Sequence, residues 1–199
     1  MDAGTSSAAP RGRHAPPLEV RLEAQRTRLL DAAAHVFARL GYADASAEAI
    51  SREAGMSKAT FYEHFANKEE CILACFDRAQ DFVLAEMANA ARSAGHDSEG
   101  RLRAGIAAFL EAVATHPDES QTLLVEIIGA GPQAAERRDA ILAAFADVVL
   151  LENQAAADRG TMPRFASPDD AFAVVGAIAE LASRQVRLGR PEEIRALGG

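Results

Sequence analysis

Apolar residues recur along most of the chain every three or four positions, the spacing that lines one face of an α-helix. The clearest example is the run Leu29, Leu30, Ala33, Val36, Phe37 and Leu40, after which Gly41 is expected to end the helix. The same pattern predicts further helices at about 46–54, 57–65, 68–92, 98–115, 117–128, 133–158 and 168–189, with a short last one from residue 191. No run alternates as a half-buried strand does, so the predicted fold class is all-α.

Composition strengthens the all-α prediction. Of the 199 residues, 49% are hydrophobic and 45 are alanine, the best helix former and a poor strand former.

The 2 cysteines are too few for a disulfide scaffold and favour a reducing compartment, so we expect a cytoplasmic protein. The amino terminus lacks the apolar core of a secretory signal, and no uninterrupted apolar run approaches the length of a membrane span. No membrane partner is therefore expected.

Charge is distributed unevenly along the chain. The formal net charge is −8, which argues against a general nucleic-acid coat but leaves local binding open. Residues 1–70 carry 9 basic and 10 acidic side chains, whereas residues 71–199 carry 12 and 19. Residues 1–17 have no periodicity and are predicted to form a disordered arm. Because the segment 11–28 is locally basic, this arm could contact DNA. A tail that makes no contact with DNA is the equally open alternative.

Residues 46–65 read SAEAISREAGMSKATFYEHF and carry the pattern of a helix-turn-helix. Ser46 and Ser57 are expected N-caps of two short helices, and Gly55 lets the chain turn steeply between them. The second helix opens with side chains that are short or polar and let a helix sit close to base edges: Ser57, Lys58, Ala59 and Thr60.

The wider segment 29–76, LLDAAAHVFARLGYADASAEAISREAGMSKATFYEHFANKEECILACF, resembles the TetR family of bacterial transcription regulators. The resemblance implies a three-helix DNA-binding domain at 18–66, joined by a long helix to a helical ligand-binding and dimerisation domain at 67–199. It also implies a ligand-responsive regulator, predicted to be a repressor, that binds a palindromic operator in double-stranded DNA as a homodimer. One departure is the carboxyl end, where the family commonly has a longer last helix; we expect an abbreviated dimer interface or a truncated chain.

The resemblance assigns DNA contacts to particular side chains. Lys58 and Thr60 are expected to reach base edges, with Ser57 and Ala59 allowing the close approach. The expected phosphate contacts are Ser46, Tyr62, His64 and Lys68. Segment 46–68 carries as many acidic as basic side chains, so one copy should bind weakly and the affinity should require two.

The remaining helices are expected to hold a small, largely apolar effector. The candidate pocket residues, chosen because flexible or aromatic apolar side chains suit such a ligand, are Phe82, Met87, Phe109, Leu124, Ile127, Phe145 and Phe172. A solid core made of the same residues is the competing interpretation. The last two helices are expected to form the dimer. Gly176 and Ala179 would allow close helix approach, Val175 would supply burial, and Glu180 and Arg184 would pair along the helix or across the twofold axis.

Other polar residues receive plainer interpretations. Glu126 is either a pocket carboxylate or, as we favour on spacing, part of a solvent-facing stripe with Glu119 and Thr122. Cys71 and Cys75 lie one helical turn apart and are predicted to be buried and inert. The 5 histidines form no ligand motif, so neither a metal nor a cofactor is expected.

Catalytic motifs of hydrolases, phosphate-binding loops and metalloproteases are absent from the sequence, so we expect no enzyme. The alternative function is a helical small-molecule-binding protein whose helix-turn-helix is vestigial and recognises no operator.

Overall fold

The computed structural model describes residues 17–198, and the predicted disordered arm therefore lies outside the described residues except for Pro17. Within them the chain is all-helical, as predicted, and contains no strand. The elements, in chain order, are α1 (Leu18–Asp44), α2 (Ala47–Glu53), α3 (Lys58–His64), α4 (Lys68–Ser93), α5 (Ser98–Thr115), α6 (Pro117–Leu124), the 3-10 helix η1 (Glu126–Gly129), α7 (Pro132–Asp158), α8 (Pro168–Arg187) and the 3-10 helix η2 (Pro191–Gly198).

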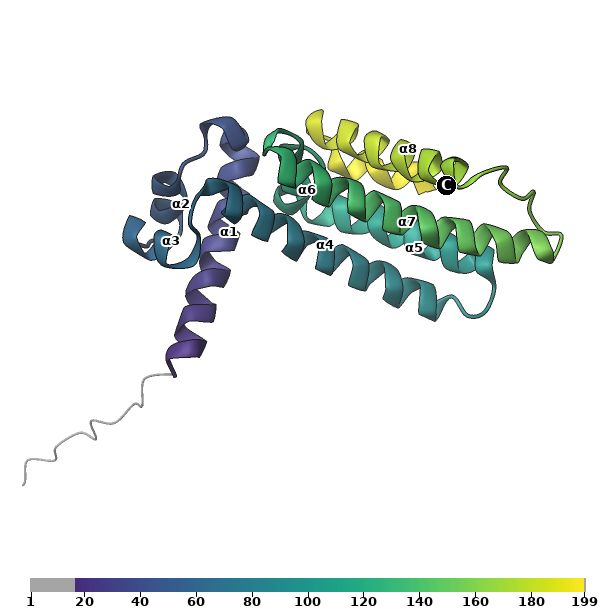
Figure 1. Cartoon of the computed structure of the whole chain (residues 1–199), viewed down its shortest axis with the longest axis horizontal. Coiled ribbons are helices and arrows are strands. Elements are labelled where there is room, and N and C mark those ends of the chain that lie inside the picture. Colours follow the sequence, from purple (N-terminus) through teal and green to yellow (C-terminus); the bar gives the residue numbers. More distant parts are fainter. Residues whose placement is uncertain (1–16, 199) are drawn as a thin grey trace, which may run out of the picture.

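The molecule has two parts arranged end to end (Figure 1). Helices α1, α2 and α3 form one end, and the amino-terminal half of α1 extends away from them. Helix α4 leaves this end and runs along the long axis with α5, α7 and α8. The helix-turn-helix is thereby held at the tip of a helical bundle, with α4 as the continuous connection.

Side-chain caps explain where the short helices begin. The hydroxyl of Ser46 accepts a hydrogen bond from the Ala49 N–H at 3.1 Å, and the hydroxyl of Ser57 accepts one from the Thr60 N–H at 3.0 Å. The Asn67 side chain accepts from the Glu70 N–H at 2.8 Å and so begins α4. Each cap satisfies an N–H that has no partner inside its helix. These starts were predictable because the capping residue lies next to its helix in the sequence.

Gly41 ends the regular part of α1, as predicted, because its φ of 75° and ψ of 161° are not helical; a short turn after this kink continues to Asp44. One boundary differs from the sequence prediction. The sixth helix ends at Leu124, and its expected last turn is the separate 3-10 helix η1.

The largest core is continuous between the two parts. It combines fully buried Phe37 of α1 and Phe61 of α3 with Phe76 of α4 and Ile127 of η1. Such burial of aromatic and branched side chains contributes about 1.5–3 kcal/mol each. The predicted domain boundary at residue 66 therefore does not separate two cores. The assignment of DNA binding to one side of it and regulation to the other stays a prediction.

A second core attaches the end of the chain to the bundle. Ile194 of η2 is fully buried against Leu110 and Val113 of α5 and Ala182 of α8. Arg195 adds a hydrogen bond to Glu111 at 2.7 Å, which lowers the pKa of that carboxyl group. The predicted ninth helix thus packs within its own subunit.

Helix α7 has an unusually apolar surface. Its most apolar 18-residue window has a mean hydropathy of 1.4, and only 22% of that window is buried inside the protein. This helix is long enough and apolar enough to span a membrane. The sequence did not predict this, because no uninterrupted apolar run in it approaches that length. Core helices of proteins in water meet the same criterion, so it is weak evidence for a membrane.

Candidate DNA-binding surface and effector cavity

The predicted helix-turn-helix is present, and its turn depends on Gly55. This residue has φ of +65°, a conformation that side chains with a Cβ rarely adopt. The guanidinium of Arg28 donates a hydrogen bond to the Ala54 carbonyl at 2.7 Å, and the Met56 N–H donates to the Ser51 carbonyl at 2.8 Å. The turn between α2 and α3 is thus held both by its own backbone and by a side chain from α1.

Helix α3 has one buried face and one exposed face. Phe61 and the adjoining Phe65 are at most 1% exposed, whereas Lys58, Ala59 and Tyr62 are exposed. The ammonium of Lys58 lies 5.9 Å from the centre of the Tyr62 ring, so the two residues share one outer surface. Ser57 and Thr60 are joined by a hydrogen bond of 2.9 Å between their hydroxyls. The structure therefore brings most of the predicted DNA contacts together on the free side of α3.

His64 and Lys68 are placed differently from what the sequence predicts. The His64 ring lies 3.4 Å from the Gln25 side chain, and the His64 carbonyl accepts from Arg26 at 3.3 Å. The Lys68 ammonium donates to the carbonyls of Tyr42 at 2.6 Å and Ala43 at 3.1 Å. Both side chains hold neighbouring helices in this structure, and their contact with phosphate stays a prediction.

Arg26 and Arg28 belong to the locally basic segment 11–28, and both hold α1 against the helix-turn-helix. Arg26 lies over the Phe65 ring at 4.7 Å, in addition to its bond to the carboxyl end of α3. The sequence did not predict these hydrogen bonds of Arg26 and Arg28, because each joins residues that are more than 25 positions apart and follow no motif.

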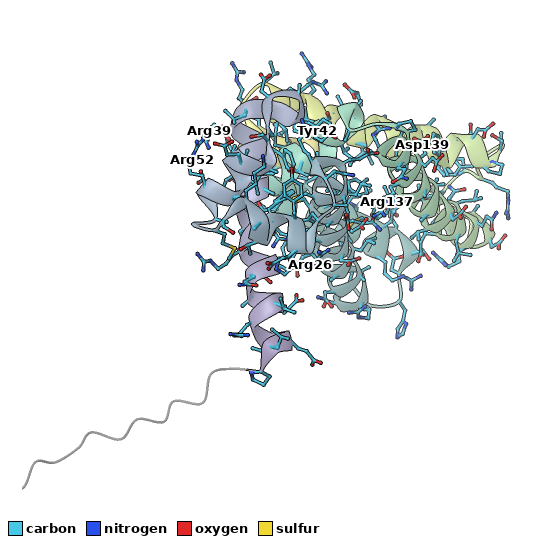
Figure 2. All side chains as sticks on the ribbon, turned by 60° about the vertical axis from the view of Figure 1, so that its left-hand side comes forward. Arg26, Arg39, Tyr42, Arg52, Arg137 and Asp139 are labelled. Atoms are coloured by element: carbon cyan, nitrogen blue, oxygen red, sulfur yellow. The ribbon has the colours of Figure 1, made fainter. Side chains whose placement is uncertain are left out.

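The junction between the two parts centres on the carboxylate of Glu126. It accepts a hydrogen bond from the Tyr42 N–H at 2.6 Å and another from the Gln121 side chain at 2.8 Å. Tyr42 lies where α1 meets the bundle (Figure 2), and burial, with a smaller effect of the Glu69 charge, raises the pKa of its phenol. Glu126 does not line the large cavity of the bundle, and the solvent-facing stripe favoured from the sequence is wrong because Thr122 is only 1% exposed.

Helix α4 is fastened to both parts near its amino-terminal end. The Arg78 guanidinium bonds to Asp31 of α1 at 2.7 Å, and the Cys75 thiol donates to the Leu30 carbonyl at 3.7 Å. Asp77 pairs with Arg137 of α7, whose side chain is labelled in Figure 2. Contacts of α1 and α7 therefore meet on the same two turns of α4.

The two cysteines are buried and free, as predicted. A hydrogen bond to Cys75, together with burial, raises the pKa of the Cys71 thiol. A protonated, buried thiol is a poor nucleophile and a poor metal ligand. Among the described residues, no group of three or more histidine, cysteine or acidic side chains is arranged to hold a metal ion.

The bundle encloses an apolar cavity of about 330 Å³ between α4, α5, α7 and α8. Four of the predicted pocket residues line it: Met87, Phe109, Leu124 and Phe145. The other three do not, because Phe82 is exposed against the His116 ring, Ile127 is buried in the main core and Phe172 is 44% exposed. Leu84 and Val148 line the cavity and are also exposed, so its mouth lies between α4 and α7.

One end of the cavity is closed by a pair of charged side chains. Arg101 of α5 binds both carboxylate oxygens of Glu152 of α7 at 2.7 Å. Burial favours the neutral acid, but hydrogen bonds from Ser98 and Arg101 outweigh it and lower the pKa of Glu152. This pair was missed from the sequence, where the two residues lie on separate helices 51 positions apart.

The predicted dimer residues divide between the interior and the surface of α8. Val175 is buried against α7, and Ala179 lines the cavity, so these two face the inside of the subunit. Gly176 has open space where a side chain would lie. Glu180 pairs with Arg187 at 2.7 Å rather than with Arg184, which is exposed.

Residues 29–75 match the family model of bacterial regulatory proteins, tetR family. The matched segment runs from within α1 to within α4 and contains the helix-turn-helix, so this part of the chain is of the tetR type. The chain is also 35% identical over 102 residues to the transcriptional activator FasR of Mycolicibacterium smegmatis. The alignment covers 51% of this chain but only 46% of FasR, so it spans about half the length of that relative.

Solved structures of regulators share the fold of this chain. The fatty acid degradation regulator FadR of Bacillus halodurans superposes with a TM-score of 0.76, covering 94% of this chain and 93% of its own, at 17% identity. FadR of Bacillus subtilis, solved in complex with stearoyl-CoA, gives a TM-score of 0.73 over 86% of this chain and 92% of its own, also at 17% identity. The chain thus carries a helix-turn-helix segment of the tetR type and shares its overall fold with solved transcriptional regulators.

Proposed function

We propose that the protein is a ligand-responsive repressor that binds a palindromic operator as a homodimer and leaves it when a small, largely apolar effector fills the cavity. The observation that carries this proposal is the position of α4. Residues 76–91 of this helix line the cavity, while its first turns are bonded to α1. A ligand that favours another position of α4 must therefore change how the helix-turn-helix is held.

The magnitude of the required coupling is modest. A hundredfold reduction of operator affinity corresponds to about 2.7 kcal/mol of differential ligand affinity between the two positions of α4. Contacts at the junction are of this size, since a hydrogen bond to a charged group contributes about 1.5–3 kcal/mol. Glu126 and Lys68 hold the backbone just after Gly41, so breaking either hydrogen bond would loosen the end of α1.

An acyl chain is the effector that this cavity suits best. All but four of its lining residues are apolar, and the lining extends along α4 from Phe76 to Ala91, a rise of about 22 Å at about 1.5 Å per residue. FadR of Bacillus subtilis shares the fold and was solved with stearoyl-CoA, which supports an acyl thioester as the first class of ligand to test.

Exposed apolar residues on α7 and α8 support the homodimer. On α8 the stripe Val174, Ala177, Leu181, Arg184 and Leu188 repeats at three- and four-residue spacing, and all five are exposed. On α7, Val148 and Leu151 are exposed as well, and Val148 also lines the mouth of the cavity. Two copies related by a twofold axis would bury both stripes in a four-helix interface. Such a dimer can place its recognition helices about 34–36 Å apart, as successive major grooves require.

The test is fluorescence anisotropy with labelled duplexes from the DNA that flanks its gene. We expect salt-sensitive binding to one palindromic duplex, and its release by lauroyl-, myristoyl-, palmitoyl- or stearoyl-CoA. If the ligand instead tightens operator binding, the protein is an activator that needs its ligand or a repressor that needs a corepressor. This outcome is relevant because FasR is named an activator. Ligand binding without recognition of any duplex would favour the alternative of a small-molecule carrier with a vestigial helix-turn-helix.

A further inference from the structure

The cavity has an uneven distribution of charge. Its four polar lining residues are Gln80, Arg101, Arg138 and Glu152. Arg101 and Glu152 neutralise each other through a bidentate pair that is largely shielded from solvent, with side chains 31% and 16% exposed. Arg138 is different, because the one carboxylate within 4 Å of it among the described residues is the exposed Asp139, at 3.8 Å. The cavity wall therefore carries one positive charge that the protein neutralises only weakly.

Arg138 and the neutral pair lie at opposite ends of the cavity. Arg138 is in the second turn of α7, next to Arg137, which pairs with Asp77 of α4. Glu152 is farther along α7, and between the two residues the helix rises about 21 Å at about 1.5 Å per residue. Gln80 of α4 is one turn beyond Asp77 and therefore belongs to the Arg138 end. Between the two ends the wall is apolar and includes Val83, Met87 and Phe145.

We propose that the effector is an amphipathic anion whose apolar chain lies along the cavity and whose negatively charged head binds Arg138. The inference rests on the proposed function and adds the chemical class and the orientation of the ligand. The tail points toward the Arg101–Glu152 pair, where an anion would meet the Glu152 carboxylate. The head lies at the end nearer to the helix-turn-helix, where α4 is bonded to α1. A ligand of this kind would act on α4 close to the contacts that position the DNA-binding domain.

A carboxylate of a free fatty acid and a phosphate of an acyl thioester share the chemistry that Arg138 would recognise. Isothermal titration calorimetry with tetradecyl ligands separates charge from chain: myristate, myristoyl-CoA, uncharged tetradecanol and the cationic tetradecyltrimethylammonium. We expect wild-type protein to bind an anionic ligand about tenfold more tightly than tetradecanol, as one charge-assisted hydrogen bond predicts. The cation should bind most weakly. A gain for myristate identifies the carboxylate, and a gain confined to myristoyl-CoA identifies the phosphates.

The variant Arg138→Gln should remove this preference and leave the affinity for tetradecanol unchanged. Arg137→Gln is the matched control, because it removes the neighbouring arginine, which pairs with Asp77 and does not line the cavity. Retention of anion preference in Arg138→Gln, or equal binding of all four ligands by wild type, would overturn the head-group assignment while the apolar effector proposal stands. If none of the four ligands binds, both the assignment and the apolar effector fail.

Discussion

Glu126 shows how one side chain can connect two parts of a chain. Its carboxylate accepts the Tyr42 N–H across 84 positions, just after the break at Gly41. At Gly41 an added Cβ would lie 3.5 Å from that carboxylate, which shows how closely the two segments approach. Lys68 binds the Tyr42 carbonyl on the other side of the same peptide segment. The end of α1 is therefore fixed by one anion from the bundle and one cation from α4.

Replacing Glu126 with alanine should destabilise the protein and weaken operator binding. The Tyr42 N–H would be deprived of its charged acceptor, which costs about 1.5–3 kcal/mol. Urea unfolding followed by circular dichroism measures the first effect, and anisotropy with the operator measures the second. Glu136→Ala, at an exposed carboxylate of α7, should change neither by more than about 0.5 kcal/mol. Wild-type stability and operator affinity in Glu126→Ala would show that this hydrogen bond does not position the DNA-binding domain.

The exposed face of α3 should separate sequence recognition from general DNA affinity. Lys58→Ala or Thr60→Ala should reduce discrimination between operator and mismatched duplexes by about 1–3 kcal/mol for each base edge that is no longer bound. Tyr62→Phe removes a hydroxyl expected to bind phosphate, and it should weaken all duplexes alike. Binding isotherms on matched and mismatched duplexes at several salt concentrations distinguish the two effects. A change of base preference in Tyr62→Phe, with none in Lys58→Ala, would contradict this assignment.

At the scale of the elements, the sequence predicts what is local. Helix starts at Ser46, Ser57 and Asn67 follow from caps adjacent to their helices, and the helix-turn-helix follows from those caps and Gly55. Which face of a helix lines a cavity is not local. Phe82 and Met87 are both apolar residues of α4, yet Phe82 meets the His116 ring while Met87 faces the cavity. Glu126, Arg28 and Arg101 likewise find partners that no spacing in the sequence predicts.

The Arg101–Glu152 pair joins α5 to α7 and should make stability depend on pH. The pKa of Glu152 is lower in the folded protein than its unfolded value of about 4.3. The stabilisation is therefore fully present above that unfolded pKa and disappears as the pH falls through the lower, folded pKa. Glu152→Gln should destabilise the protein at neutral pH by about 1 kcal/mol, and the difference from wild type should shrink in acid.

Guanidinium unfolding of wild type and Glu152→Gln at a series of pH values measures this dependence. Glu99→Gln removes an exposed pair with Arg103 and serves as the control, with an expected effect below about 0.5 kcal/mol. A constant difference between wild type and Glu152→Gln down to strongly acidic pH would contradict the linkage.

At the scale of the whole molecule, the apolar exposed faces of α7 and α8 need a partner. Leu151 of α7 is 66% exposed, and Leu181 of α8 is 44% exposed. An unpartnered surface of this composition favours association, and a twofold interface would cover it. The same surface explains why α7 meets the length and hydropathy of a membrane span without being buried in its own subunit.

Leu151→Glu should dissociate the dimer, because a carboxylate would be buried without a partner at the centre of the interface. Sedimentation velocity at micromolar concentration measures the change in mass. Leu22→Glu, at a 38% exposed leucine of α1 away from both stripes, should leave the dimer intact. If Leu151→Glu sediments as the wild-type dimer, the interface lies elsewhere.

Under the proposed function, occupancy of the cavity and binding of the operator are coupled through α4. Calorimetry of one acyl ligand, titrated into the protein alone and into the protein saturated with operator, measures this coupling. By thermodynamic linkage, the operator must weaken ligand binding by the same factor, about a hundredfold, by which the ligand weakens operator binding. We expect equal factors in both directions. Identical ligand affinity with and without operator would contradict this coupling, even if the protein bound each partner tightly.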